Sequence, residues 1–264
     1  MIRYLLILAL WLCSPLLSAA TFDHDNWHSL LAANVYATDG NSSTSVDYAG
    51  FARDRDALQA YLAALSEVTR EDFDTWPGEA QLAFLINAYN AWTVELILTR
   101  YPGLESIRDL GNLLRSPWKK AIAPLLGKTR SLDDIEHGLI RGSGRYNEPR
   151  IHFAVNCASI GCPSLRAQAY TAGQLEEQLE AQTQQFLGDR SRNRLRGDTL
   201  ELSSIFKWYR DDFGLGWKGQ GDLVDFIEYY ASALELTAQD ITRLRSGDIT
   251  LAFLDYNWDL NDRT

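Results

Sequence analysis

The sequence predicts an α+β fold in which helices predominate and the strands form only a small sheet. Apolar residues recur at helical spacing in many segments, whereas few short stretches alternate between apolar and polar residues. No repeat, low-complexity run or long linker divides the chain, which favours one globular domain over residues 21–264. Of the 264 residues, 46% are hydrophobic and 23% charged, so the chain can form a core and is not a disordered protein.

Seven segments have the apolar spacing of helices, and three alternate as strands do. The predicted helices cover residues 54–68, 79–101, 132–141, 171–187, 205–213, 221–234 and 237–246. The predicted strands cover residues 150–156, 199–202 and 249–256. Phe206, Tyr209 and Phe213 lie at core spacing within one of these helices, which favours a packing role for their rings.

Residues 1–20 have the parts of a secretory signal peptide. Arg3 gives a basic start, an apolar run covers residues 5–12, and the small residues 18–20 form a cleavage site. The apolar run is shorter than the roughly 20 residues that span a bilayer. Cys13 follows a bulky residue, whereas lipid-attachment sites use a small one. We therefore expect a periplasmic or secreted protein, with no stable membrane insertion after cleavage.

Charge and motifs exclude several classes of partner. The formal net charge is −10, and the acidic residues are scattered along the chain, so nucleic acid is not an expected partner. There is no glycine-rich phosphate loop after a strand, no Gly-x-Ser-x-Gly motif and no His-Glu-x-x-His motif. The cysteines and histidines lack the close pair spacing of zinc modules. The sequence therefore predicts neither a metal nor a cofactor.

The helix predicted over residues 79–101 is apolar around more than half of its circumference, so it is expected to be buried on most sides. Asn87 and Asn90 lie three residues apart within it. Buried amides must be hydrogen-bonded, and we expect these partners near residues 150–162. The amides either clamp the backbone of a loop or bind a ligand.

Glu136 and His137 lie one turn into the helix predicted over residues 132–141, whose N-cap is Ser131. Adjacent helical residues point in different directions, so at most one of the two is expected to face any given cleft. His137 could act as a general base near neutral pH, or it could be a packing residue.

The segment 150–156 is predicted to direct Ile151, Phe153 and Val155 to the core and to place His152 and Asn156 on the opposite face. It leads directly into a turn that contains glycine and serine, a common way to build a site. We expect His152, Asn156 and either Glu136 or His137 to converge on one pocket. Alternatively, His152 only donates one hydrogen bond to a loop carbonyl.

Cys157 has two interpretations. It could be a nucleophile, with His152 or His137 as the base and Asn156 or Asn90 as the orienting group. Alternatively, Cys157 and Cys162 form a disulfide that fixes the turn, which an oxidising compartment favours.

Several ordered motifs make the sequence resemble the domain of unknown function 547 family, which occurs in exported bacterial proteins and at the C-terminal end of some plant proteins. They cover residues 46–48, 83–91, 132–141, 149–157, 162–163, 204–209 and 255–258. The resemblance implies one domain and carries no established activity. Its motifs include all the candidate residues named above.

Two classes of function follow. The first is a hydrolase or acyl transferase acting on a cell-envelope substrate, with catalysis by His152, His137 and Cys157. The second is a non-catalytic binding module, whose polar cluster and Cys157–Cys162 disulfide fix a loop that recognises a partner. A papain-like or transglutaminase-like topology, with Cys157 at a helix N-terminus facing an imidazole, would favour the enzyme. Separation of these groups would favour the module.

Overall fold

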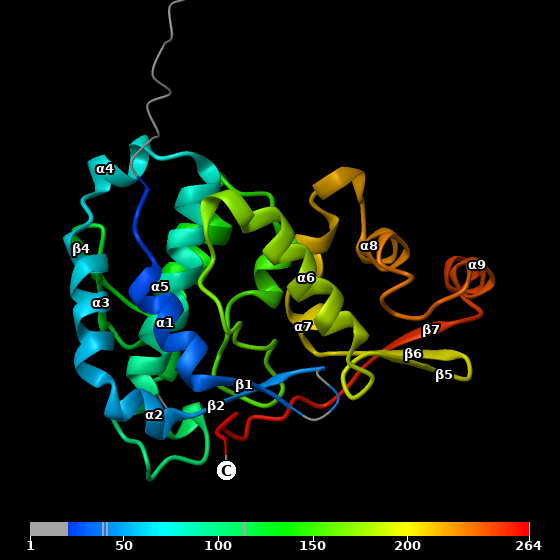
Figure 1. Cartoon of the computed structure of the whole chain (residues 1–264). Helices are drawn as coiled ribbons and strands as arrows, with labels where there is room; N and C mark the ends of the chain where they lie inside the picture. The colour runs from blue at the N-terminus through cyan, green and yellow to red at the C-terminus, as the bar shows by residue number, and fades with distance from the viewer. Residues whose placement is uncertain (1–20, 39, 41, 113–114, 264) are drawn as a thin grey trace, which may run out of the picture.

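Helices form most of the described chain, and its strands lie in three small sheets (Figure 1). The structure, a computed structural model, describes residues 21–38, 40, 42–112 and 115–263. The predicted signal peptide lies outside these residues. The architecture confirms the predicted α+β class in which helices predominate.

The α-helices are α1 (Asp25–Asn34), α2 (Tyr48–Arg53), α3 (Arg55–Glu67), α4 (Arg70–Thr75), α5 (Gly78–Leu98), α6 (Leu175–Gly188), α7 (Ile205–Trp208), α8 (Leu223–Tyr229) and α9 (Ala238–Ser246). The π-helix η4 (Asp134–Ile140) and the 3-10 helices η2 (Ile107–Leu110), η3 (Pro117–Lys119), η5 (Arg141–Ser143), η6 (Pro149–Phe153), η7 (Ala172–Gln174), η8 (Arg210–Gly214) and η9 (Trp217–Gly219) complete the helical structure. The strands are β1 (Val35–Ala37), β2 (Thr44–Val46), β3 (Ala123–Leu125), β4 (Lys128–Arg130), β5 (Arg194–Arg196), β6 (Thr199–Leu202) and β7 (Thr250–Phe253).

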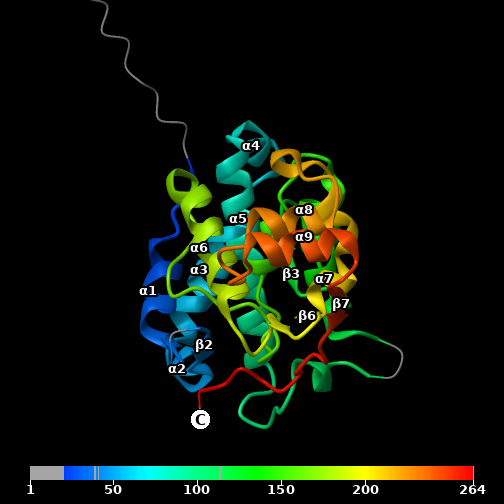
Figure 2. The ribbon, with the colours of Figure 1, turned by 90° about the vertical axis from the view of Figure 1, so that its right-hand side faces the viewer.

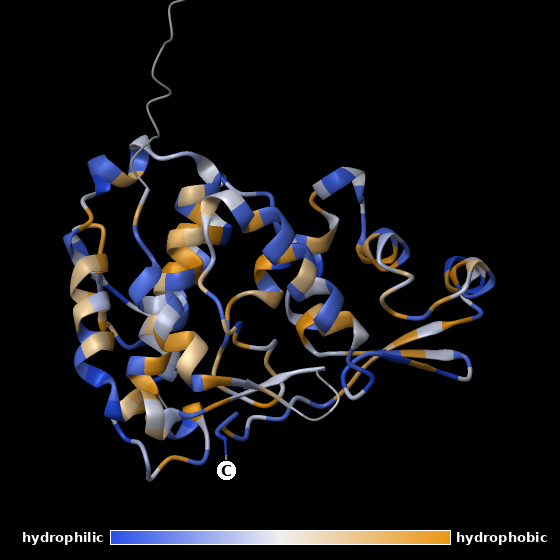
Figure 3. Ribbon diagram, in the orientation of Figure 1, coloured by the Kyte–Doolittle hydropathy of each residue, from blue (hydrophilic) through white to orange (hydrophobic). Residues whose placement is uncertain are grey.

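Helix α5 is the centre of the first helical cluster (Figure 1). Every residue from Ala80 to Leu98 is buried, as its all-round apolar pattern predicts, and Figure 3 shows apolar residues along its length. Helices α2 and α3, η4 and η7 pack against it. The amphipathic face predicted for residues 54–68 is the buried face of α3. Both helix predictions are therefore confirmed.

The second cluster contains α6 to α9 and a three-stranded sheet. Its core is formed by packed aromatic rings, among them Phe153, Phe206, Phe213 and Phe226. Strand β6 pairs antiparallel with β5 and parallel with β7. Figure 2 views the molecule from this side and shows α8 and α9 next to each other.

The C-terminal segment after β7 returns to the first cluster, where the chain ends close to α2 and β2 (Figure 1). Leu260 packs into the first core. Val46 donates its backbone N–H to the carbonyl of Asn261 (2.9 Å) and accepts from Arg263 (2.9 Å). This segment therefore ties the two clusters together.

Residues 150–156 do not form the predicted strand. Pro149 to Phe153 form η6, and the Glu148 side chain accepts from the backbone N–H of Arg150 (3.1 Å) at its start. Proline at the first position favours this helical turn because its φ is already fixed. All seven residues are buried, so the alternation of apolar and polar side chains does not separate a core face from a solvent face. Ion pairs and hydrogen bonds accommodate the polar side chains instead.

The helix predicted over residues 205–213 is also interrupted. Tyr209 leaves the helical conformation (φ −115°, ψ 25°) between α7 and η8. The other C-terminal helices are confirmed with shorter bounds, and the N-terminal elements α1, β1 and β2 have no counterpart among the predicted segments. None of the helices in the described part of the chain has both the length and the apolar character needed to cross a bilayer.

Candidate functional site

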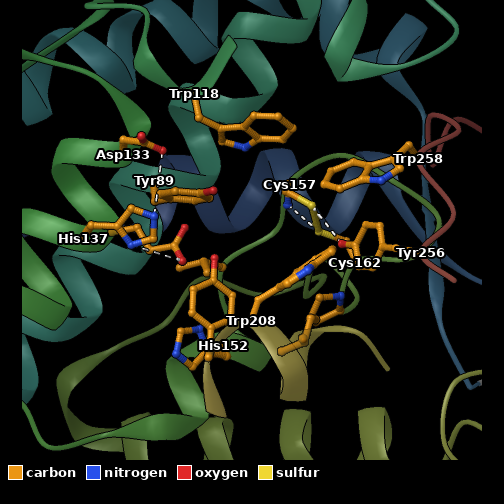
Figure 4. Close-up of a pocket in the computed structure, with 15 residues that line it drawn as sticks. Tyr89, Trp118, Asp133, His137, His152, Cys157, Cys162, Trp208, Tyr256 and Trp258 are labelled. Atoms are coloured by element: carbon orange, nitrogen blue, oxygen red, sulfur yellow. Dashed lines mark hydrogen bonds and ion pairs between the residues drawn. A yellow bond between two sulfur atoms is a disulfide. The ribbon is translucent and has the colours of Figure 1, made fainter. Parts of the chain in front are cut away.

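A pocket of about 270 Å³ lies where elements of both clusters meet (Figure 4). Helix α5, η4, η6, α7 and the C-terminal segment all contribute to its wall. Its lining residues are Tyr89, Trp118, Asp133, Glu136, His137, His152, Val155, Cys157, Cys162, Pro163, Ile205, Trp208, Tyr209, Tyr256 and Trp258. Figure 4 shows Asp133 and His137 on one side, and Trp208, Tyr256, Trp258 and the disulfide on the other.

The first side of the pocket, which we call the acidic side, consists of Asp133, Glu136 and His137. Glu136 is buried (6% exposed), and its charge acts on the hydroxyls of Tyr89 and Tyr209. Burial, and then the Glu136 charge, raise the pKa of both tyrosines, so their hydroxyls stay protonated. Burial also raises the pKa of Asp133.

Glu136 and His137 both face this pocket, so the prediction that at most one of them could face a given cleft is wrong. The helix begins as predicted, because the Ser131 hydroxyl accepts from Asp134 N (3.1 Å) and the Asp134 carboxylate accepts from Ser131 N (2.8 Å). It continues as the π-helix η4 instead of an α-helix. A π-turn holds more residues than an α-turn, so adjacent side chains diverge less.

The neighbours of His137 fix which ring nitrogen accepts a hydrogen bond. Arg141 Nη1 lies 2.8 Å from His137 Nδ1. A guanidinium nitrogen can only donate, so Nδ1 accepts and the proton of the neutral ring is on Nε2. His137 Nε2 lies 3.9 Å from Asp133, and Nδ1 lies 3.9 Å from Glu136. His137 therefore presents a donor to the pocket, and Arg141 occupies its basic nitrogen.

His152 is held by an acid that the sequence analysis does not single out. Its Nε2 donates to Asp212 (2.7 Å), and its ring stacks on Tyr209 at 3.9 Å. Arg141 donates to the same carboxylate through Nε (2.6 Å) and Nη2 (3.0 Å). Burial lowers the pKa of His152, so the ring is neutral with its proton on Nε2. Burial raises the pKa of Asp212, but the bonds from His152 and Arg141 outweigh it and hold that pKa below its usual range.

The amides of Asn87 and Asn90 clamp loop backbone. Asn90 donates to the carbonyl of Ala154 (3.0 Å) and accepts from Asn156 N (2.8 Å), inside the predicted region. Asn87 donates to the carbonyl of Tyr170 (2.7 Å) and accepts from its N–H (3.0 Å), outside that region. The backbone-clamp interpretation therefore describes both residues.

Asn156 does not converge with His152, contrary to the prediction. Its side chain donates to the carbonyl of Pro163 (2.7 Å) and accepts from Ala158 N (2.9 Å), so it bridges the turn that it precedes. Because η6 ends at Phe153, His152 and Asn156 do not belong to one strand, in which alternate residues would share a face. The structure brings His152 together with Glu136, His137 and Cys157 instead.

Cys157 and Cys162 form the predicted disulfide. The Cys157 backbone N–H points to Cys162 Sγ (2.6 Å), and Cys157 Sγ lies 3.1 Å from the Tyr256 hydroxyl. Cys157 follows the 3-10 helix η6 and is not at a helix N-terminus. Because its sulfur is bonded, Cys157 has no thiol that could act as a nucleophile.

The other side of the pocket is an aromatic wall, formed by Trp118, Trp208, Tyr256 and Trp258. Trp258 packs against Tyr256 (4.5 Å), Trp118 (5.7 Å) and Trp208 (5.8 Å between ring centroids). Tyr256 and Trp258 come from the C-terminal segment, which pairs with the disulfide loop through Ile160 N to Asp259 O and Gly161 N to Asn257 O, both at 2.8 Å. The disulfide loop thereby supports this wall.

Local sequence patterns did not assign these four residues to a site. Trp208, Tyr256 and Trp258 lie within motifs that carried the family resemblance, which is the signal that could have found them. Within the described ranges, no group of three or more His, Cys, Asp or Glu side chains could hold a metal ion.

The fold and the pocket thus define a class: a mainly helical α+β protein whose pocket has an acidic side, an aromatic wall and a disulfide. Residues 73–187 of the chain match the model of the family described as "Protein of unknown function, DUF547", which supports the family resemblance. The matched residues include α5, η4, η6 and the disulfide loop. No curated protein and no solved structure matches the chain.

Proposed function

We propose that this protein is exported and binds a small ligand in the pocket without transforming it. The observation that carries the proposal is the disulfide, because it removes the thiol that a cysteine-dependent hydrolase or acyl transferase needs. An apolar, aromatic-lined cavity with a few polar groups is the usual form of a small-molecule site.

The two histidines support the same proposal. The buried His152 donates its Nε2–H to the Asp212 carboxylate, and its Nδ1 is sealed from solvent without a partner among the described residues. Arg141 occupies Nδ1 of His137. Neither ring therefore offers a free basic nitrogen beside a nucleophile, which is the arrangement that nucleophilic catalysis requires.

Export is supported by the signal-peptide features of residues 1–20 and by the disulfide, since disulfides persist in oxidising compartments. We also propose that residues 21–264 fold as one domain, because the C-terminal segment joins both clusters. Intact mass of the natively exported protein tests the cleavage site. A mass that retains residues 1–20 in a soluble extracellular fraction would contradict it.

A second candidate function, hydrolysis of a cell-envelope substrate, is favoured by the buried Glu136 carboxylate. It could act as a general base towards a bound water while the Nε2–H of His137 donates to the substrate. Peptide, ester and peptidoglycan substrates should be screened with the wild type, Glu136→Gln and His152→Ala. Turnover that Glu136→Gln abolishes would replace the binding proposal with this one.

Ligand-observed NMR with a library of small molecules tests binding directly. His137→Trp should fill the pocket and abolish the signal of any ligand that binds there. Lys128→Trp adds the same ring to the exposed strand β4 and is the matched control. Ligands that bind wild type and His137→Trp equally would place the binding site elsewhere.

A further inference from the structure

We infer that the pocket binds an organic cation with an alkylated ammonium head, the charge meeting Glu136 and the alkyl groups meeting the aromatic wall. The inference rests on the proposed binding function and names the chemical class of the ligand. It follows from three features of the pocket: a buried acid, basic groups already committed elsewhere, and aromatic rings opposite the acid.

The first feature is the environment of Glu136. Its side chain is more than nine-tenths buried, and its charge acts on the neutral hydroxyls of Tyr89 and Tyr209. A buried charge costs free energy unless an opposite charge compensates it. Asp133 adds a second carboxyl group to the same side of the pocket. The pocket therefore has a buried acidic group, Glu136, for which a ligand could supply the countercharge.

The second feature is that the neighbouring basic groups have other partners. His137 accepts from Arg141 at the nitrogen nearest Glu136, so this nitrogen does not donate to Glu136. The guanidinium of Arg141 makes two hydrogen bonds to Asp212, and from that position its charge also acts on Glu136 without a hydrogen bond to it. Lys119 is exposed, and its charge acts on Asp133. Glu136 is thus left facing the cavity.

The third feature is the aromatic wall across the cavity (Figure 4). The faces of tryptophan and tyrosine rings attract cations, and groups of such rings bind quaternary ammonium ions. Trp208 is 47% exposed at the rim, although tryptophan is rarely so open in a folded protein. A primary ammonium needs about three acceptors, whereas an alkylated head can use the rings. A net charge of −10 also attracts cations to the protein.

Isothermal titration calorimetry with choline and with its neutral carbon isostere, 3,3-dimethylbutan-1-ol, separates charge from shape. We expect saturable binding of choline and at least about tenfold weaker binding of the isostere. Equal binding of both would overturn the cation inference and leave the binding proposal standing. If neither binds, the cation inference fails, and the binding proposal is then decided by the NMR screen.

Two variants test the two sides of the site. Glu136→Gln should weaken choline binding by about tenfold or more, whereas Glu177→Gln on the exposed face of α6 should not change it. Trp208→Leu alters an exposed rim residue, so it tests the wall even if Glu136→Gln does not fold. Tyr229→Leu, an exposed aromatic residue outside the pocket, is its control. Unchanged choline affinity in Trp208→Leu would contradict a cation held by the wall.

The alkylated ammonium head group of choline occurs both in free choline and in the lipid phosphatidylcholine. Co-sedimentation with phosphatidylcholine vesicles, compared with phosphatidylglycerol vesicles, distinguishes these sources. We expect a free ligand, because the pocket is a recess of about 270 Å³ rather than an apolar surface. If the protein sediments with phosphatidylcholine vesicles and free choline releases it from them, the ligand is the lipid head group and not a free molecule. If the protein sediments equally with both kinds of vesicle and choline does not release it, the pocket is not the site that binds the lipid, and the inference is overturned.

Discussion

Replacing Asn90 with alanine should destabilise the protein strongly, because one side chain satisfies two buried backbone groups. Asn90 donates to the carbonyl of Ala154 (3.0 Å) and accepts from the N–H of Asn156 (2.8 Å). Ala154 and Asn156 are 1% and 3% exposed, so water cannot readily replace the amide. Leaving a buried polar group unpaired costs about 1 to 3 kcal/mol. Two such groups therefore lower the free energy of unfolding by about 2 to 6 kcal/mol.

Urea unfolding followed by tryptophan fluorescence measures this loss. Asn26→Ala is a matched control, because Asn26 makes one hydrogen bond on the exposed surface, and its cost should stay within about 0.5 kcal/mol. Asn90→Asp keeps an acceptor for Asn156 but removes the donor to Ala154, so it should also destabilise the fold. If Asn90→Ala costs no more than Asn26→Ala, the clamp does not stabilise the fold and the reasoning is refuted.

Three further predictions concern the core, the pH dependence of stability and the disulfide. Trp92 is 8% exposed, so Trp92→Ala should cost about 3 to 5 kcal/mol in urea unfolding, and a cost typical of surface substitutions would show that its ring is not core. Burial lowers the pKa of His24 to about 4, whereas the unfolded imidazole titrates near 6.5. The unfolded state therefore binds a proton first as the pH falls, and stability should drop by up to about 3 kcal/mol between pH 6.5 and 4. His24→Gln should flatten this part of the stability profile; an unchanged slope would argue against His24 as its source. The natively exported protein should have no alkylatable thiol at Cys157 or Cys162 before reduction, and removing the disulfide should cost about 2 kcal/mol. Two alkylatable thiols in the unreduced protein would restore Cys157 as a possible nucleophile.

The helices α3 and α5 could be predicted because their signal is local. In α3 the apolar positions recur on one face, and that face is buried. In α5 apolar residues surround the helix, and nearly all of it is buried. Residues 150–156 were wrongly predicted to form a strand, because the alternation rule assumes that polar side chains face solvent. In a fully buried segment, polar side chains can instead pair with other polar groups of the protein. Arg150 illustrates this: it is 1% exposed and pairs with Glu148 (2.6 Å) and Glu176 (2.6 Å).

The site could be predicted only in part, because its components come together from distant segments. Glu136, His137 and His152 were found as titratable side chains near turns. Asp212 lies 60 residues after His152, and Trp258 lies more than 100 residues beyond Glu136. No spacing rule relates such positions, since their proximity follows from the path of the C-terminal segment. The aromatic wall therefore required a structure.

The buried amides and the disulfide have a common physical origin in the segment from Ala154 to Pro163. This segment is largely buried, yet it follows η6 without joining a helix or a sheet ladder. Its backbone groups must still be paired. Asn90 and Asn156 supply side-chain partners, and the C-terminal segment supplies backbone ones. The amides that looked like ligand-binding groups are thus committed to holding an irregular buried loop. Under the proposed binding function, recognition falls to side chains outside this loop, above all Glu136 and the aromatic wall, which line the same cavity.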